Sequence, residues 1–158
     1  MQDFVHLHVH TQYSLLDGQA SVSRLVDKAM KDGMKGIAVT DHGNMFGIKE
    51  FTNYVNKKNS GPKGEIKDLK KRIAGIESGE IECEDKEAEI ADCRAKMAEA
   101  ESKLFKPIVG CEMYVARRTM DKKEGKPDQS GYHLIVLAKN EKGYHNLIKL
   151  VSHAWTRG

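Results

Sequence analysis

The sequence predicts an α/β fold, because segments with the periodicity of strands alternate with segments that have the periodicity of helices. Residues 3–10 alternate between apolar and histidine side chains, as in a strand with one buried face. Residues 36–40 form a short apolar run, which is typical of an interior parallel strand. Alternation returns at residues 108–115 and 132–138. We therefore expect four parallel strands within one α/β domain.

Helices are predicted between these strands. The segment 21–32 carries an apolar stripe and is followed by Gly33, a residue that often ends helices because it tolerates a left-handed backbone. A second helix is expected over 46–57, with four side chains directed inward, namely Phe46, Phe51, Tyr54 and Val55. Asn140 is a suitable N-cap for a last helix, whose apolar residues are Leu147, Ile148, Leu150, Val151 and Ala154.

The segment 61–106 differs in composition from the rest of the chain. Apolar residues recur at steps of three and four on both sides of Gly79, which predicts an antiparallel helical hairpin after a helix break at residues 60–62. Residues 61–76 carry five basic and two acidic residues, whereas residues 77–106 carry five basic and ten acidic residues. We expect a solvated insertion, because charge-rich helical faces are usually solvated; an arm that docks a partner is the alternative.

Composition limits the class of protein. The chain has 158 residues, of which 39% are hydrophobic and 31% are charged, and this suits one domain with a core. It contains neither a membrane-spanning apolar run nor a secretory signal pattern, so we expect a cytoplasmic protein with no membrane partner. Its three cysteines lack CxxC spacing, which argues against a disulfide framework. A net charge of +3 does not by itself indicate a nucleic-acid binder.

The alternate histidines His6, His8 and His10 are the most informative pattern. In a strand their imidazoles share one face, and imidazole nitrogen is a ligand for zinc, iron and manganese. His8 and His10 lie at the end of the predicted strand, whereas His6 lies one step deeper and is expected to orient a ligand from behind the site. Asp17 follows in a loop that can fold back over the site, although an aspartate before glycine is also common in plain turns.

The ends of the other predicted strands supply further candidate ligands. His42 directly follows the second strand, Glu112 lies in the third and His133 opens the fourth. Active sites of parallel barrels lie at the carboxyl ends of strands, so His133 fits least well and is equally consistent with a core histidine. We assign Asp41 to loop capping and Cys111 to the core. The candidates exceed one tetrahedral zinc site and indicate two or three ions, an arrangement suited to phosphoester hydrolysis: His8, His10, Asp17, His42, Glu112 and His133.

Several strings resemble the PHP (polymerase and histidinol phosphatase) domain family. The first two are Phe4-Val5-His6-Leu7-His8-Val9-His10-Thr11, continued by Tyr13-Ser14-Leu15-Leu16-Asp17-Gly18, and Thr40-Asp41-His42-Gly43-Asn44-Met45-Phe46-Gly47. Three later strings begin at Lys106, His133 and Gly143 and narrow the resemblance to the PHP domains of bacterial replicative polymerases of the polymerase III alpha-subunit type. The resemblance covers the chain outside 61–106, where the hairpin departs from the compact pattern.

The resemblance implies a distorted (β/α)7 barrel, of which this chain would hold the N-terminal part with the first four or so strands. The segment 61–106 would be an α-helical hairpin inserted into this PHP domain. The resemblance further implies a centre of two or three divalent ions (zinc, manganese or iron), held by His8, His10, Asp17, His42, Glu112 and His133. A cysteine and an Asp-x-His motif that complete the family's centre are expected beyond Gly158, as are the catalytic aspartates of the polymerase.

Three functions follow as alternatives from the resemblance. The parent protein is expected to be a DNA-directed DNA polymerase of DNA replication, with DNA and other replicase subunits as partners, whose PHP domain supports metal-dependent 3′–5′ exonuclease proofreading. In the second alternative, the PHP domain is catalytically silent, stabilises the polymerase and docks partners. A free-standing PHP phosphoesterase is the third, and it is disfavoured because such enzymes share the first two strings but not the later ones.

Overall fold

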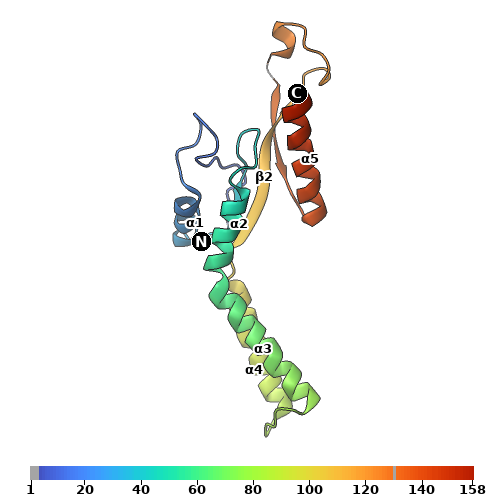
Figure 1. Cartoon of the computed structure of the whole chain (residues 1–158). Helices are drawn as coiled ribbons and strands as arrows, with labels where there is room; N and C mark the ends of the chain where they lie inside the picture. The colour runs from blue at the N-terminus through green and yellow to red at the C-terminus, as the bar shows by residue number, and fades with distance from the viewer. Residues whose placement is uncertain (1–3, 130) are drawn as a thin grey trace. The chain divides into compact units, whose positions relative to one another are not determined.

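The computed structural model describes residues 4–129 and 131–158 (Figure 1). It is a mixed α/β chain that divides into two compact units, residues 1–54 with 106–158 and residues 55–105, and each unit is described by itself. No helix among the described residues is long and apolar enough to cross a membrane. The elements in chain order are α1 (Val22–Lys31), β1 (Gly36–Val39), α2 (Ile48–Lys58), α3 (Ser60–Ser78), α4 (Lys86–Ser102), β2 (Lys106–Val115), the 3₁₀ turn η1 (Lys126–Asp128), β3 (Tyr132–Leu137) and α5 (Glu141–Arg157).

The sheet of the first unit has the order β1-β2-β3. β1 and β2 run parallel, with Gly36 opposite Lys106, whereas β2 and β3 run antiparallel, with Gly110 opposite Leu137. The prediction of an all-parallel sheet is therefore wrong for β3. A parallel connection needs a crossover element, usually a helix, and the described positions of residues 116–131 contain no helix longer than the three-residue η1. The chain accordingly returns as an antiparallel neighbour.

The predicted first strand, residues 3–10, is not a regular strand where it is described; residue 3 lies outside the described residues. The chain bends at Leu7 and His8 and is held to β1 by two backbone hydrogen bonds, from Ala38 N–H to His6 O and from Thr40 N–H to Val9 O, both 2.9 Å. His6 and Val9 are three residues apart, whereas their partners Ala38 and Thr40 on β1 are two residues apart. The N-terminal segment therefore contains one extra residue between the two hydrogen bonds. One extra residue disrupts regular pairing, as it does in a β-bulge, so the strict alternation of faces is lost. The described sheet consequently has three strands instead of four.

Helices cover this sheet as the periodicity predicts. All four residues of β1 are buried, as expected for an interior strand, and α1 packs against it with Val26 and Ala29 buried. α5 begins after Asn140, whose side chain accepts a hydrogen bond from Gly143 N–H, and it buries Leu147 and Val151 against Cys111 of β2. α2 starts at Ile48, two residues later than predicted, so that Phe46 lies in the preceding turn and is exposed rather than inward.

The second unit is a pair of helices, α3 and α4, that pack against each other. The apolar stripes identified in the sequence form their contact, with Ile66, Ile76, Cys93 and Ala100 buried. Between α2 and α3 only Asn59 is not helical, so the helix break lies one residue before the predicted one. Pro62 is accommodated in the first turn of α3, where its missing N–H leaves no hydrogen bond unmade.

Asn59 connects the two ends of this unit. Its side chain is buried and makes two hydrogen bonds with the backbone of Phe105, donating to the carbonyl at 2.8 Å and accepting from the N–H at 2.9 Å. Replacing Asn59 with Ala leaves a buried backbone donor and a buried acceptor unpaired, at a cost of about 1–3 kcal/mol each. We therefore expect Asn59→Ala to lower the free energy of unfolding of the hairpin by roughly 2–6 kcal/mol.

Hydrogen exchange of the Phe105 amide and of the amides of α3 and α4 measures this effect. Asn56→Ala is the matched control, because the side chain of Asn56 accepts an exposed hydrogen bond from Lys63 and makes no other hydrogen bond within residues 4–129 and 131–158. Equal exchange rates in the two variants would contradict the assigned role of Asn59.

Candidate metal centre

One cavity of about 400 Å³ is lined by the six side chains that the sequence singles out: His8, His10, Asp17, His42, Glu112 and His133. They come from the N-terminal segment, from the loops after that segment and after β1, and from strands β2 and β3. The antiparallel direction of β3 explains why His133 reaches the cavity. Because β3 runs opposite to β1 and β2, its first residues lie at the edge where the other two strands end, and His133 is paired with Tyr114 there.

The carboxylate of Glu112 lies at the centre of this arrangement. His42 Nδ1 lies 2.8 Å and His10 Nε2 3.0 Å from its Oε2, and His133 Nδ1 lies 3.0 Å from its Oε1. The side chain of Glu112 is 7% exposed. Burial alone would raise the pKa of Glu112, but its hydrogen bond to His42 and the nearby charges of His10 and His42 lower that pKa overall. Glu112 is thus held as a carboxylate, the form that binds metals.

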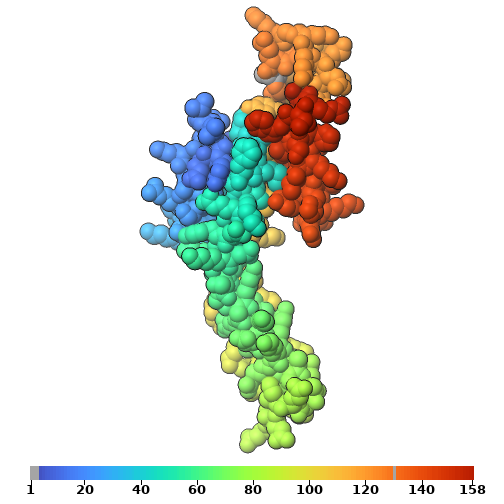
Figure 2. Space-filling view, in the orientation of Figure 1, coloured from blue at the N-terminus to red at the C-terminus, as the bar shows by residue number. Residues whose placement is uncertain are grey.

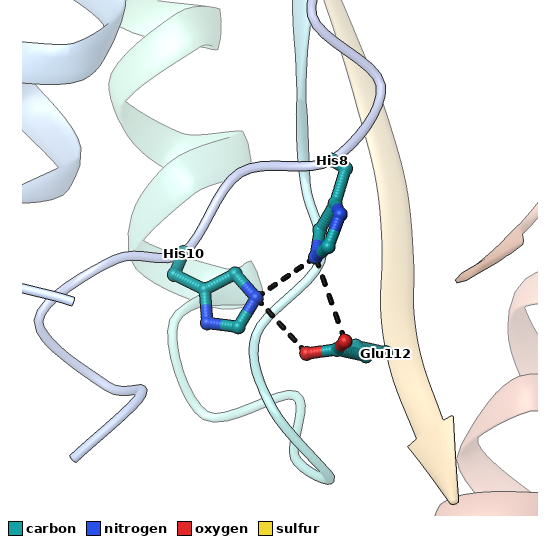
Figure 3. Close-up of side chains that lie close together, drawn as sticks. All are labelled: His8, His10 and Glu112. Atoms are coloured by element: carbon teal, nitrogen blue, oxygen red, sulfur yellow. Dashed lines mark hydrogen bonds and ion pairs between the residues drawn. The ribbon is translucent and has the colours of Figure 1, made fainter. Parts of the chain in front are cut away.

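His8, His10 and Glu112 converge on one point (Figure 3). The Nε2 atoms of His8 and His10 are 3.0 Å apart, and His8 Nε2 lies 3.7 Å from Glu112 Oε1. Ligand atoms at about 2.0–2.1 Å from a tetrahedral zinc ion lie about 3.3 Å from one another, so these separations match those of atoms that share one ion. The donor set therefore fits a divalent ion such as zinc, manganese or iron.

Two further groups of three ligand atoms overlap with the first. His10, Asp17 and His42 form one group, and His42, Glu112 and His133 form the other, with all atoms of a group within 4.8 Å of one another. His10 Nδ1 is buried and has no hydrogen-bond partner among the described residues, which is unfavourable for a ring placed only for packing. Three overlapping groups exceed what a single ion requires.

Asp17 is brought to the cavity by a tight turn. Ser14 O accepts hydrogen bonds from the N–H groups of Asp17 and Gly18, at 3.1 and 2.8 Å. A Cβ at position 18 would lie only 2.0 Å from Thr11 O, so this turn requires glycine. Leu16 adopts a left-handed backbone (φ 73°), which is unfavourable for a leucine and shows that the surrounding hydrogen bonds determine the turn. Asp17 Oδ2 then lies 3.8 Å from His42 Nδ1.

Asp41 holds this loop to the end of β1. Its carboxylate, 1% exposed, accepts hydrogen bonds from Thr11 N–H (2.6 Å), Thr11 Oγ1 (2.8 Å) and Ser14 Oγ (2.7 Å). Ser14 Oγ in turn accepts a hydrogen bond from the N–H of His42 at 3.0 Å. Asp41 is therefore a loop-capping residue, as the sequence predicts, and it positions both Asp17 and His42.

Tyr114 belongs to the site and was missed from the sequence. Its ring packs edge-on against His42 and His133, with centroid distances of 4.7 and 4.9 Å, and its hydroxyl hydrogen-bonds His42 Nε2. The available signal is period two: Tyr114 follows Glu112 by two residues on a strand and so shares its face. With Nε2 engaged by Tyr114, the Nδ1 atom of His42 is the one that faces Glu112 and Asp17.

His6 and Cys111 lie outside the cavity. His6 packs edge-on against Phe4 at 4.7 Å and lines a separate cavity with Val9 and residues of α1. Its role in orienting a ligand from behind the site stays a prediction. Cys111 is fully buried, and burial raises the pKa of its thiol to about 11, as expected for a core cysteine.

Comparison with known proteins matches residues 6–158 to the PHP domain family. The chain is similar to the DNA polymerase III subunit alpha of Borreliella burgdorferi and of Treponema pallidum, with 38% identity to each over 156 residues, 98% of this chain and 10% of the relative. It is similar to the DNA polymerase III subunit alpha of Aquifex aeolicus, with 32% identity over 163 residues, 99% of this chain and 10% of the relative. The chain thus spans about a tenth of the length of these relatives.

The lowered pKa of Glu112 makes the free energy of unfolding depend on pH. A carboxyl group whose pKa is lower in the folded state contributes stability above its unfolded pKa, and that contribution is lost as the pH falls through the folded pKa. We compare the wild type with Glu112→Gln in the presence of a chelator, so that bound metal does not contribute. The wild type should have the larger unfolding free energy above pH 4.5, the ordinary pKa of glutamate, and this difference should shrink as the pH falls below that value. Denaturant melts of both proteins at a series of pH values measure this difference. A difference that does not change with pH contradicts the stated electrostatics.

Tyr114 should influence metal affinity without being a ligand. Tyr114→Phe keeps the ring packing but removes the hydrogen bond to His42, and losing such an orienting partner typically lowers metal affinity about 10- to 100-fold. Titration of the metal-free protein with zinc or manganese measures the loss. Tyr132→Phe, an exposed tyrosine on β3, is the control and should leave the affinity unchanged. Equal metal affinities of the Tyr114→Phe and Tyr132→Phe variants would show that the hydroxyl of Tyr114 does not support metal binding.

Proposed function

Because the chain belongs to the PHP domain family, we propose that it forms the N-terminal part of a distorted (β/α)7 barrel in a replicative DNA polymerase and that this barrel supports metal-dependent 3′–5′ exonuclease activity. The observation that carries this proposal is the convergence of six ligand-type side chains on one cavity. Two or three divalent ions would occupy it, held in the three overlapping groups described above. Zinc, manganese and iron all suit these ligands.

Exposure indicates how a substrate would enter. The side chains of His8, Asp17 and His133 are about half exposed, at 51%, 53% and 48%, whereas Glu112 lies at the floor with 7%. A phosphodiester would therefore approach from the side of the three exposed residues. Bound ions would supply activation of water and stabilisation of charge on the phosphate oxygens. The residues of this chain hold the ions: Glu112 from below, and Asp17 and the imidazoles from the sides.

The wider assignment follows from the relatives, which are alpha subunits of DNA polymerase III. We infer that the parent protein is a DNA-directed DNA polymerase, that its partners are DNA and other replicase subunits, and that it acts in the cytoplasm. The cysteine and the Asp-x-His motif of the family would complete the centre from later parts of the chain. The segment 61–106 would be an insertion into the domain.

Primer degradation tests the catalytic proposal. The intact polymerase is given a primer with a mispaired 3′ end and manganese or zinc, without nucleotides, and is compared with His8→Ala and His42→Ala. We expect both variants to lose most of the degradation while keeping polymerase activity, since each substitution removes a nitrogen donor that the bound ions would require. His153→Ala, an exposed histidine on α5, is the matched control and should degrade primer as the wild type does. Equal degradation by the wild type and the three variants would contradict the proposal.

A structural role is the second candidate, and one observation favours it. The N-terminal segment is held to β1 by two backbone hydrogen bonds and by the bond from Val9 N–H to Thr40 Oγ1, at 2.9 Å. An ion bound by His8, His10 and Glu112 would fasten this segment to β2. An ion at a hundred times its dissociation constant would stabilise the fold by about 2.7 kcal/mol.

A chelator melt separates the two candidates. If metal removal lowers the melting temperature of the intact protein and no metal restores nuclease activity, the centre is structural. If activity returns with metal and is lost in His8→Ala, the centre is catalytic, whatever its effect on stability.

A further inference from the structure

Helix α3 carries a cluster of lysines that the metal centre does not involve. A cavity of about 520 Å³ on its surface is lined by Lys63, Lys67, Lys70 and Lys71 together with Ile66 and Ala74. All six residues belong to the hairpin unit. The face of the hairpin visible in Figure 2 is formed largely by α3, in green, whose side chains lie at the surface. We call these four lysines the α3 lysine face.

The spacing of the lysines places them along one side of the helix. Positions 63, 67, 70 and 71 follow the i, i+4, i+7, i+8 pattern of neighbours on one helical face. At 1.5 Å per residue, the eight steps from Lys63 to Lys71 span about 12 Å along the axis. Successive phosphates of one DNA strand advance about 3.4 Å along the duplex axis, so this length matches three or four of them. The acidic residues of α3, namely Glu65, Asp68 and Glu77, do not line the cavity.

Within the described residues, these lysines are left out of the ion pairs that the rest of the hairpin makes. Arg72 pairs with Glu89 and Arg94 with Glu77 between the helices, whereas Lys96 and Lys103 pair with Asp92 and Glu99 within the second arm. Lys67, Lys70 and Lys71 have no hydrogen bond or ion pair in the described chain, and Lys63 donates only to the neutral side chain of Asn56. Positive charge is therefore concentrated on one face without internal compensation.

We propose that the α3 lysine face binds the phosphate backbone of duplex DNA without reading its sequence. Ammonium groups act as point charges toward phosphate, and a linear array of them fits a linear polyanion. Arginine and aromatic residues, which read base edges or stack on bases, are absent from the cavity lining. The lining also lacks a large exposed apolar side chain that could anchor a bilayer, because Ile66 is buried. This proposal does not depend on the nuclease activity.

Lysine footprinting on the intact protein tests the proposal. Acetylation of each lysine is followed by mass spectrometry with and without a DNA duplex of arbitrary sequence, at low and at high salt. We expect DNA to slow acetylation of Lys67, Lys70 and Lys71 several-fold at low salt and not at high salt. The exposed lysines Lys31 and Lys49 should not be protected. Absence of protection on α3, or protection by polyglutamate in place of DNA, overturns the proposal.

Variants supply the second readout. K67Q/K70Q/K71Q should weaken duplex binding and reduce the slope of log affinity against log salt by about two to three, since each lost phosphate contact contributes about 0.9. The control K31Q/K49Q/K149Q removes the same charge from exposed lysines outside the hairpin and should keep the wild-type slope. Circular dichroism melts establish that both triple variants fold. Equal slopes for the two variants would refute the assignment of DNA to α3.

Discussion

Glu112 lies almost fully buried on β2, and its two oxygens lie within 3.7 Å of imidazole nitrogens from four histidines. These histidines come from the N-terminal segment, from the loop after β1 and from β3, so one carboxylate connects parts of the chain that are far apart in sequence. A buried carboxylate is unfavourable unless it is paired and hydrogen-bonded. The imidazoles satisfy it here, and the same arrangement brings their nitrogens to the spacing of metal ligands.

The backbone around Glu112 is held by the loop after β1, which also carries a second buried carboxylate, that of Asp41. Asp41 takes three hydrogen bonds from Thr11 and Ser14, which binds the loop carrying Asp17 to the end of β1. Glu112 N–H donates to Asp41 O at 3.1 Å, and Gly43 N–H donates to Glu112 O at 2.8 Å, so the loop after β1 is also held to β2. The loops that carry Asp17 and His42 are thus positioned by hydrogen bonds within the protein. This pre-organisation is what a metal site requires of its protein.

Much of this arrangement was predictable, because it depends on local patterns. The apolar stripe that forms α1, the buried run that forms β1 and the two stripes of the hairpin are properties of short segments. The six cavity residues were found from the histidine alternation and from polar residues in or near the predicted strands. The bend at Leu7 and His8 was not predictable, since the extra residue exists only in relation to β1. The direction of β3 depends on whether residues 116–131 form a crossover helix. This direction also decides whether His133 reaches the cavity. The only sequence signal for Tyr114 was its place two residues after Glu112, which puts both side chains on the same face of the strand.

Whether these six side chains hold metal can be determined by anomalous diffraction from crystals of the intact protein grown with manganese or zinc. A difference map at the absorption edge of the metal locates each ion independently of any activity. We expect at least two peaks inside the cavity, one of them within ligand distance of His8, His10 and Glu112. Crystals in which the metal binds elsewhere on the protein while this cavity shows no peak would contradict this expectation.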